Sequence, residues 1–192
     1  MAAEISAHAR KWGPAVIALA LGVAALAAAT LSQAFAGEGD TLALEVKATY
    51  LIKLPPFITW PVDAFPSSVS PFTLCVVGQD PFGDLLDKAL AGKRLIDRPV
   101  AVLRIDTAAQ DSPCQVMYVA AGPQPAVKSL QAVAGRPVLT VTDSAVDGAK
   151  GIVNFILRDN HVRLEIDQAG AIRNRLEISS KLLSVAASVT PK

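Results

Sequence analysis

The sequence contains few of the residues from which catalytic and metal centres are usually built. It has two histidines and two cysteines in 192 residues, and one histidine, His8, lies near the N-terminus. A zinc or transition-metal site needs several such ligands, so no metal site is expected. No G-x-G-x-x-G, P-loop or G-x-S-x-G motif is present, which leaves nucleotide-phosphate binding and serine hydrolase chemistry without support. We therefore expect neither a cofactor nor enzymatic activity.

A strong net charge of either sign is also missing. Lys and Arg total 18, and Asp and Glu total 17. Residues 1–36 hold two of these basic residues and one of the acidic residues, so the remainder of the chain is formally neutral. Without a basic surface, binding to nucleic acid and electrostatic binding to a membrane are not expected.

An apolar stretch near the N-terminus predicts export from the cytoplasm. Two basic residues precede an alanine-rich apolar run at 14–31, and an A-x-A-type motif at 34–36 follows it. These are the three parts of a secretory signal peptide (1–36), with cleavage expected between Ala36 and Gly37. A retained anchor is the alternative, since about 18 apolar residues approach the length that spans a bilayer, although alanine-rich runs insert weakly. In both cases residues 37–192 are expected to form one exported domain.

Both cysteines, Cys75 and Cys114, lie in the predicted exported part. An even number of cysteines in an oxidising compartment indicates a disulfide. Closing a loop of about 40 residues would stabilise the fold by roughly 3–4.5 kcal/mol, less any strain. Cys75 also lies in an apolar run where a buried free cysteine is common, so that alternative stays open. The sequence does not show whether such a bond is structural or redox-sensing.

Helix and strand signals alternate along the exported part. Helices are expected at 41–54, 81–90, 124–134 and 179–188. Strands are expected at 72–77, 99–105, 115–120, 137–142, 151–157 and 161–166. Pro55 and Pro56 end the first helix, because proline lacks a backbone donor and restricts the residue before it. The order predicts a three-layer α/β domain with a mainly parallel sheet, helices on both faces and a C-terminal antiparallel hairpin, joined by the three residues 158–160.

One candidate ligand site follows the strand at 72–77. Asp80, Phe82 and Gly83 lie where an α/β sheet usually places its ligand, at the carboxyl end of a strand. A tight turn explains the same residues without a ligand. In that interpretation Asp80 is the N-cap of the next helix and Pro81 its first residue.

The few aromatic residues are concentrated between residues 50 and 65. Tyr50, Phe57 and Trp60 are candidates for a partner-binding surface, since aromatic residues are enriched in protein interfaces. Packing of the first helix against the sheet explains the same concentration.

The second hairpin strand carries the remaining candidates. Arg163 and Glu165 alternate with apolar residues, so they occupy its solvated face. Glu165 and Asp167 have the spacing of an acid/base pair, but the nearby Arg163 and Arg173 favour ordinary surface ion pairs. His161, beside the turn, is better explained as a surface residue than as a general base.

Several segments in order resemble the YfiR family (DUF4154) of periplasmic regulators. They are Ala48-Thr49-Tyr50-Leu51, Phe57-Ile58-Thr59-Trp60-Pro61, Phe72 to Gly78, Asp80-Pro81-Phe82-Gly83, Gly135 to Val141, Asn154-Phe155, Val162 to Ile166, and Ile178 to Leu183. Each segment is weak alone, but the ordered set spans nearly all of the exported part. Relatives with a second cysteine pair differ from this chain, and Pro55-Pro56 interrupt a helix that is more continuous in the family.

The resemblance implies a secreted, non-enzymatic periplasmic protein. It would bind the periplasmic sensor region of a membrane-bound diguanylate cyclase and hold the enzyme inactive, which couples envelope conditions to cyclic-di-GMP, biofilm formation and motility. The implied contacts are the aromatic and hairpin candidates named above. A periplasmic small-ligand binding module that uses the turn at 80–83 is the alternative. The sequence leaves the oligomeric state open, a homodimer included.

Overall fold

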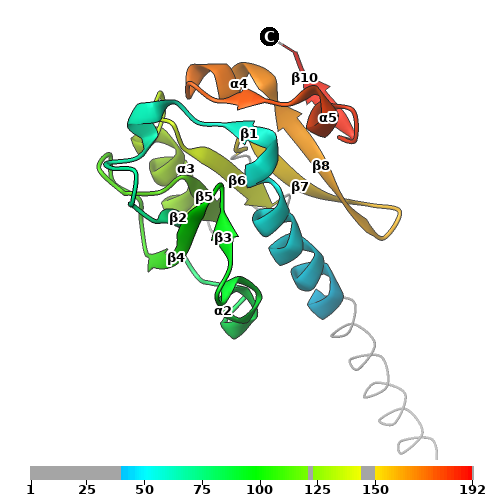
Figure 1. The fold of residues 1–192 in the computed structure, drawn as a ribbon. Coiled ribbons are helices and arrows are strands. Elements are labelled where there is room, and N and C mark those ends of the chain that lie inside the picture. The colour runs from blue at the N-terminus through cyan, green and yellow to red at the C-terminus, as the bar shows by residue number, and fades with distance from the viewer. Residues whose placement is uncertain (1–39, 121–122, 144–149, 192) are drawn as a thin grey trace, which may run out of the picture. The chain divides into compact units, whose positions relative to one another are not determined.

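The computed structural model describes residues 40–120, 123–143 and 150–191 of the chain (Figure 1). Residues Ala43–Lys192 form one compact unit, and Met1–Leu42 belong to another. The predicted leader, with Ala36 and Gly37 at its cleavage site, lies outside the described residues. Every helix within the described ranges is too short or too polar to cross a lipid bilayer.

In the described part of the chain, an eight-stranded sheet lies at the centre of the larger unit. Its strands, in spatial order, are β10 (Ser188–Thr190), β8 (His161–Asp167), β7 (Val153–Arg158), β6 (Leu139–Asp143), β5 (Val116–Val119), β2 (Phe72–Val77), β4 (Arg98–Ile105) and β3 (Arg94–Leu95). Neighbours are parallel from β4 to β7 and between β8 and β10. They are antiparallel between β7 and β8 and between β3 and β4. The predicted mainly parallel sheet with a C-terminal hairpin is confirmed.

Helices cover both faces of this sheet. The first helix covers 40–53 and ends just before the two prolines, as they predicted, and the 3-10 turn η1 (Pro55–Phe57), which was not predicted, follows. The other described helices are η2 (Val62–Ala64), α2 (Asp84–Leu90), α3 (Pro123–Ala132), α4 (Gln168–Arg173) and α5 (Ser180–Leu183). A separate antiparallel pair consists of β1 (Ile58–Thr59) and β9 (Glu177–Ile178).

Alternate side chains of the buried strand β2 enter two different cores. Leu74 and Val76 belong to the larger core, which includes buried residues of the first helix, α2, α4 and α5. Cys75 and Val77 belong to the smaller core, which α3 covers through Ala126. A strand buried on both faces must be apolar at every position, which accounts for the continuous run from Phe72 to Val77.

The expected N-cap role of Asp80 is wrong. Helix α2 begins at Asp84, and its N-cap position is taken by Gly83, which has a φ of 49°. Asp80 accepts a hydrogen bond from the backbone N–H of Phe82 at 2.7 Å and closes a short Asx turn. Because the Asx turn takes up Pro81 and Phe82, the helix starts at Asp84 and not at Pro81 as predicted.

The β7–β8 connection has two residues, and the three-residue prediction is wrong. Arg158 pairs with His161 in the ladder, which leaves Asp159 and Asn160 as the turn. Their φ values of 52° and 58° lie in the left-handed region. A type I′ hairpin turn requires this conformation, and Asp and Asn tolerate it better than other residues with a side chain.

The predicted helix at 179–188 is also wrong in length. Helix α5 ends at Leu183, and Ser179 caps it by accepting a hydrogen bond from the N–H of Leu182. Strand β10 follows on the sheet edge. Several elements of two to six residues, among them β1, β3, β9, β10 and α4, were not predicted, because such short segments carry no periodic pattern.

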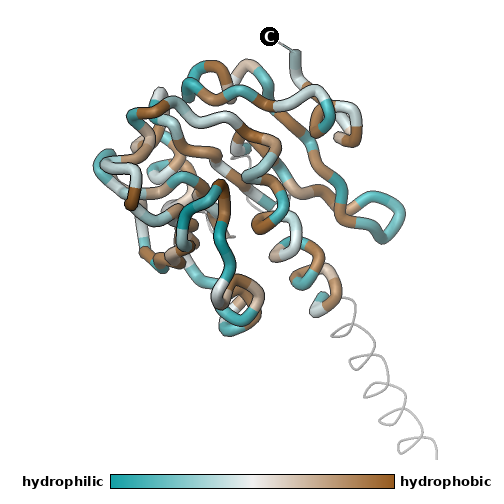
Figure 2. Tube along the Cα trace, viewed as in Figure 1, coloured by the Kyte–Doolittle hydropathy of each residue, from teal (hydrophilic) through white to brown (hydrophobic). Residues whose placement is uncertain are grey.

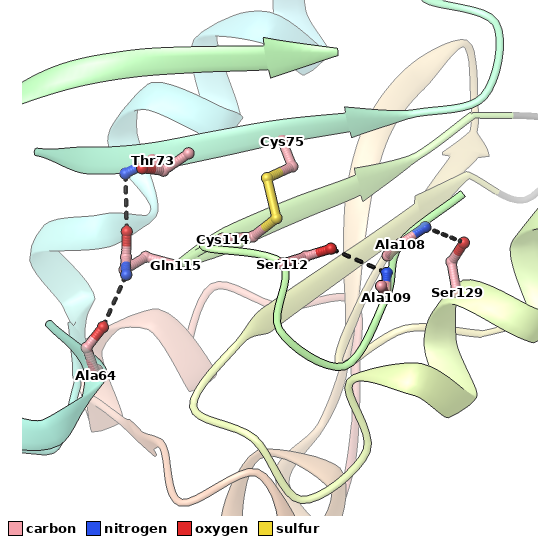
Figure 3. Close-up of a disulfide and its surroundings, with 9 residues drawn as sticks. All are labelled: Ala64, Thr73, Cys75, Ala108, Ala109, Ser112, Cys114, Gln115 and Ser129. Atoms are coloured by element: carbon pink, nitrogen blue, oxygen red, sulfur yellow. Dashed lines mark hydrogen bonds between the residues drawn. A yellow bond between two sulfur atoms is a disulfide. The ribbon is translucent and has the colours of Figure 1, made fainter. Parts of the chain in front are cut away.

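The predicted disulfide joins two parallel neighbours of the sheet (Figure 3). Cys75 of β2 and Cys114, which precedes β5, are bonded with a Cα–Cα distance of 5.7 Å. Their side chains are 0% and 3% exposed, so solvent has little access to the bond. The disulfide prediction is confirmed, and the alternative of a free buried cysteine is not.

The side chain of Gln115 strengthens the same region (Figure 3). Its Oε1 accepts a hydrogen bond from the N–H of Thr73 at 2.8 Å, and its Nε2 donates to the carbonyl of Ala64 at 2.8 Å. The covalent bond at the middle of β2 and this buried amide at its start therefore both hold the beginning of β5 against β2.

We expect loss of the disulfide to lower the free energy of unfolding by about 3–4 kcal/mol, because the bond closes a loop with a sequence separation of 39. The double substitution Cys75→Ala/Cys114→Ala tests this in urea unfolding. The reduced wild-type protein is the control, since it keeps both side chains and lacks only the bond. A loss below about 1 kcal/mol in both samples would contradict the expectation.

Candidate functional site

The structure places the aromatic candidates largely in the core. Trp60 is 9% exposed and packs edge-on against Phe72, with ring centroids 5.4 Å apart. Tyr50 is half-buried, and its ring lies 5.9 Å from that of Phe155 in β7. Phe57 is half-buried as well. Tyr50 and Phe57 keep surface that a partner can reach, whereas Trp60 presents almost none.

The candidate turn at Asp80, Phe82 and Gly83 is tied to the sheet by one arginine. Arg104 of β4 donates from Nε to Asp80 at 2.7 Å and from Nη2 to the carbonyl of Gly83 at 3.0 Å. Hydrogen bonding from Arg104 also lowers the pKa of Asp87, on α2. Phe82 is buried against Tyr118, with ring centroids 4.8 Å apart. The turn is thus occupied by contacts within the fold.

A polar cluster lies near the same end of the sheet. Lys47 of the first helix forms an ion pair with Asp143, at the end of β6, and both side chains are mostly buried. The hydroxyl of Tyr118 lies 3.5 Å from the same carboxylate. Burial, and secondarily the charge of Asp143, raise the pKa of Tyr118 well above its ordinary value, so the hydroxyl stays protonated. The cluster holds the first helix on the sheet.

Arg163 and Glu165 lie on the face of the hairpin opposite the first helix. In the antiparallel register Glu165 lies beside Asn154 and Arg163 beside Ile156. Glu165 accepts hydrogen bonds from Asn154 Nδ2 at 3.1 Å and from Lys150 Nζ at 3.2 Å. Arg163 is exposed. Glu165 therefore contributes to the fold, while Arg163 remains open to a partner.

The expected surface ion pairs are present with one change of partner. Asp167 pairs with Arg173 at 3.0 Å, as the sequence suggested, and its other oxygen caps α4 at Gly170. Glu165 pairs with Lys150 rather than with Arg163. The hydrogen bond from Asn154 is the main cause that lowers the pKa of Glu165 below its ordinary value of 4.5.

This shift predicts a pH-dependent role for Glu165. A carboxylate with a lowered folded-state pKa stabilises the fold above its ordinary pKa, and the stabilisation is lost as the pH falls through the folded value. We expect Glu165→Gln to cost about 1 kcal/mol in unfolding free energy near pH 7, and this cost should shrink as the pH falls below the ordinary carboxyl pKa. Glu177→Gln, at an exposed position on β9, is the control and should change little across this pH range. A constant cost of Glu165→Gln across the range would refute the role.

Two cavities lie away from the predicted ligand turn. One of about 620 Å³ is lined by α4 and β9, with Gln168, Arg175 and Glu177 among its residues. The other, of about 460 Å³, lies at the amino ends of β2, β5 and β6, next to Cys114 and Gln115. Of the predicted site residues in the described chain, Cys114 alone lines one of these two cavities.

The smaller cavity has a charged wall. Asp63 and Arg175 form an ion pair at 2.7 Å across 112 residues of sequence, and Arg136 lines the same cavity. Sequence reasoning missed these residues, because they come from the short helix η2 and two separate connections with no motif spacing. In the described ranges no group of three or more His, Cys, Asp or Glu side chains is arranged to hold a metal ion.

Comparison with protein-family models identifies the family of this chain. The model of the YfiR/HmsC-like family, DUF4154, matches residues 44–187, which include most of the first helix, every strand of the large sheet except β10, and both cysteines. The chain belongs to this family. A search of curated proteins finds no match. Membership in the YfiR/HmsC-like family indicates a periplasmic regulator of diguanylate cyclase signalling rather than a catalyst, and the disulfide fits an oxidising compartment.

Proposed function

We propose that this chain is a periplasmic regulatory protein that binds the periplasmic sensor region of a membrane-bound diguanylate cyclase and holds the enzyme inactive. The observation that carries the proposal is the family match over residues 44–187, nearly the whole of the predicted exported part. The leader at 1–36 delivers the chain to the compartment where that sensor region lies, whether it is cleaved or kept as an anchor.

Repression requires only a difference in affinity between two conformations of the partner. A regulator that binds the inactive cyclase more tightly shifts the population towards that state, whereas equal affinity for both states shifts nothing. The regulator therefore needs no reacting group, only an exposed surface that is complementary to one state.

The proposed contact residues are Tyr50, Phe57, Arg163 and Glu165. Trp60 is left out, because its side chain is almost fully buried. Tyr50 packs on Phe155, on the sheet face that the first helix covers, whereas Arg163 and Glu165 lie on the opposite face. A partner that touches both groups must therefore reach around an edge of the sheet.

The test is the rate of cyclic-di-GMP synthesis by the full-length cyclase in membranes. We expect added exported domain to lower the rate in a saturable way, because binding selects the inactive state. A cyclase that lacks its periplasmic region is the control and should be insensitive. Full activity of the intact enzyme at saturating concentrations of the domain would end the proposal.

A second candidate function, a small-ligand binding module, is favoured by the cavity of about 460 Å³ beside Cys114. Its size and its mixed polar lining suit a small metabolite. A ligand that binds the folded state raises the melting temperature by mass action, so a thermal-shift screen of envelope metabolites tests it. Arg175→Ala should abolish any such shift.

A further inference from the structure

The outer edge of β8 is covered along only half of its length. Strand β10 pairs with the second half, Glu165 to Asp167, and the N–H of Ala187 donates to the carbonyl of Leu164 at 2.8 Å. No described strand pairs with that edge at 161–163. Figure 1 shows this part of the hairpin extending beyond β10.

The backbone of Val162 points out of this open edge. The carbonyl of Leu164 faces β10. In an antiparallel strand the backbone groups of every second residue point to the same side, so the N–H and the carbonyl of Val162 also point outwards, away from β7. Backbone groups on an exposed edge are a template for another strand. Val162 as a whole is 9% exposed because its side chain is buried, so the edge offers a partner only the backbone donor and acceptor of this residue, which no described strand uses.

The two faces beside the open edge differ in chemistry. On the first-helix face Val162 pairs with Leu157, which is 62% exposed. On the opposite face lie His161 and Arg163, both exposed, with Arg158 beside His161 in the register. Asp159 lies in the turn beyond them, and the tip of the hairpin is hydrophilic (Figure 2).

We infer that the cyclase's periplasmic region docks by adding an extended segment to β8 at Val162. The segment carries an apolar side chain on the face of Leu157 and carboxylates on the face of Arg163. This inference rests on the proposed function. It also explains how one partner reaches both faces of the sheet, since an added strand presents alternate side chains to each face.

A second copy of this chain fits the edge less well. A symmetric antiparallel pairing about Val162 would set Arg163 opposite His161 of the other copy and bring the two Arg163 side chains close on one face. Diagonal neighbours on one face of a strand pair stay within reach of long side chains, so the two arginine charges would repel each other and weaken the pairing. The other two edges of the sheet are less suitable for a charged partner strand. Strand β10 carries no charged side chain and is followed by Pro191, and strand β3 is only two residues long.

The experiment follows the Val162 amide while the exported domain is titrated with the cyclase's periplasmic region. Calorimetry measures binding, and amide hydrogen exchange by NMR reports where a strand is added. We expect exchange at Val162 to slow by at least about tenfold in the complex, because its N–H gains a hydrogen-bond acceptor. Exchange at Ser129 of α3, a buried residue on the far side of the sheet from the first helix, is the internal reference and should be unchanged.

Two substitutions test the same edge. Arg163→Glu should weaken binding by about tenfold or more, since it sets carboxylates against carboxylates. Lys128→Glu, the same charge reversal at an exposed site on α3, is the matched control and should leave affinity within about twofold. Val162→Pro removes the outward N–H and should also weaken binding. The melting temperature of this variant is measured first. If the variant does not fold, the test relies on Arg163→Glu alone.

The outcomes separate the two proposals. Binding with slowed exchange at Val162 supports the inference. Binding with unchanged exchange at Val162 and unchanged affinity of Arg163→Glu overturns the inference and leaves the proposed function standing. Absence of any binding to the cyclase region overturns the proposed function, and the inference falls with it.

Discussion

The fold depends on burying the central parallel strands from both sides. Strands β2, β5 and β6 are buried at every residue, so each face needs its own cover. The first helix, α2, α4 and α5 supply one core, and α3 supplies the other. The disulfide crosses from β2 to the start of β5 within the smaller core. A domain stabilised in this way has little freedom left at its centre, so its activity is expected at its margins.

The margins differ in what they offer. The carboxyl end of the sheet, where an α/β protein usually binds its ligand, is filled here by Arg104, Phe82 and the Lys47–Asp143 ion pair. The amino end has a cavity with a charged wall. The β7–β8 hairpin has an edge with unused backbone groups and two chemically different faces. For a protein that acts by contact, the last of these has the properties that specificity requires.

Long elements and continuous apolar runs could be predicted from the sequence. The strand from Phe72 to Val77 and the helix ended by Pro55 are where their patterns placed them, because burial and proline chemistry act locally. The disulfide between Cys75 and Cys114 could be predicted because the leader indicates an oxidising compartment. Asp80 was misplaced, since an Asx turn and an N-cap use the same residue type. The open edge of β8 depends on where β10 pairs, and no local pattern carries that information.

The central claim is that this chain acts outside the cytoplasm to restrain a diguanylate cyclase. The most direct measurement compares cellular cyclic-di-GMP in a strain that lacks the chain, complemented either with the full sequence or with residues 37–192 alone. The account predicts that the full sequence restores a low cyclic-di-GMP level and that the leaderless form does not. Equal restoration by both forms, or an unchanged level in the strain that lacks the chain, would contradict it.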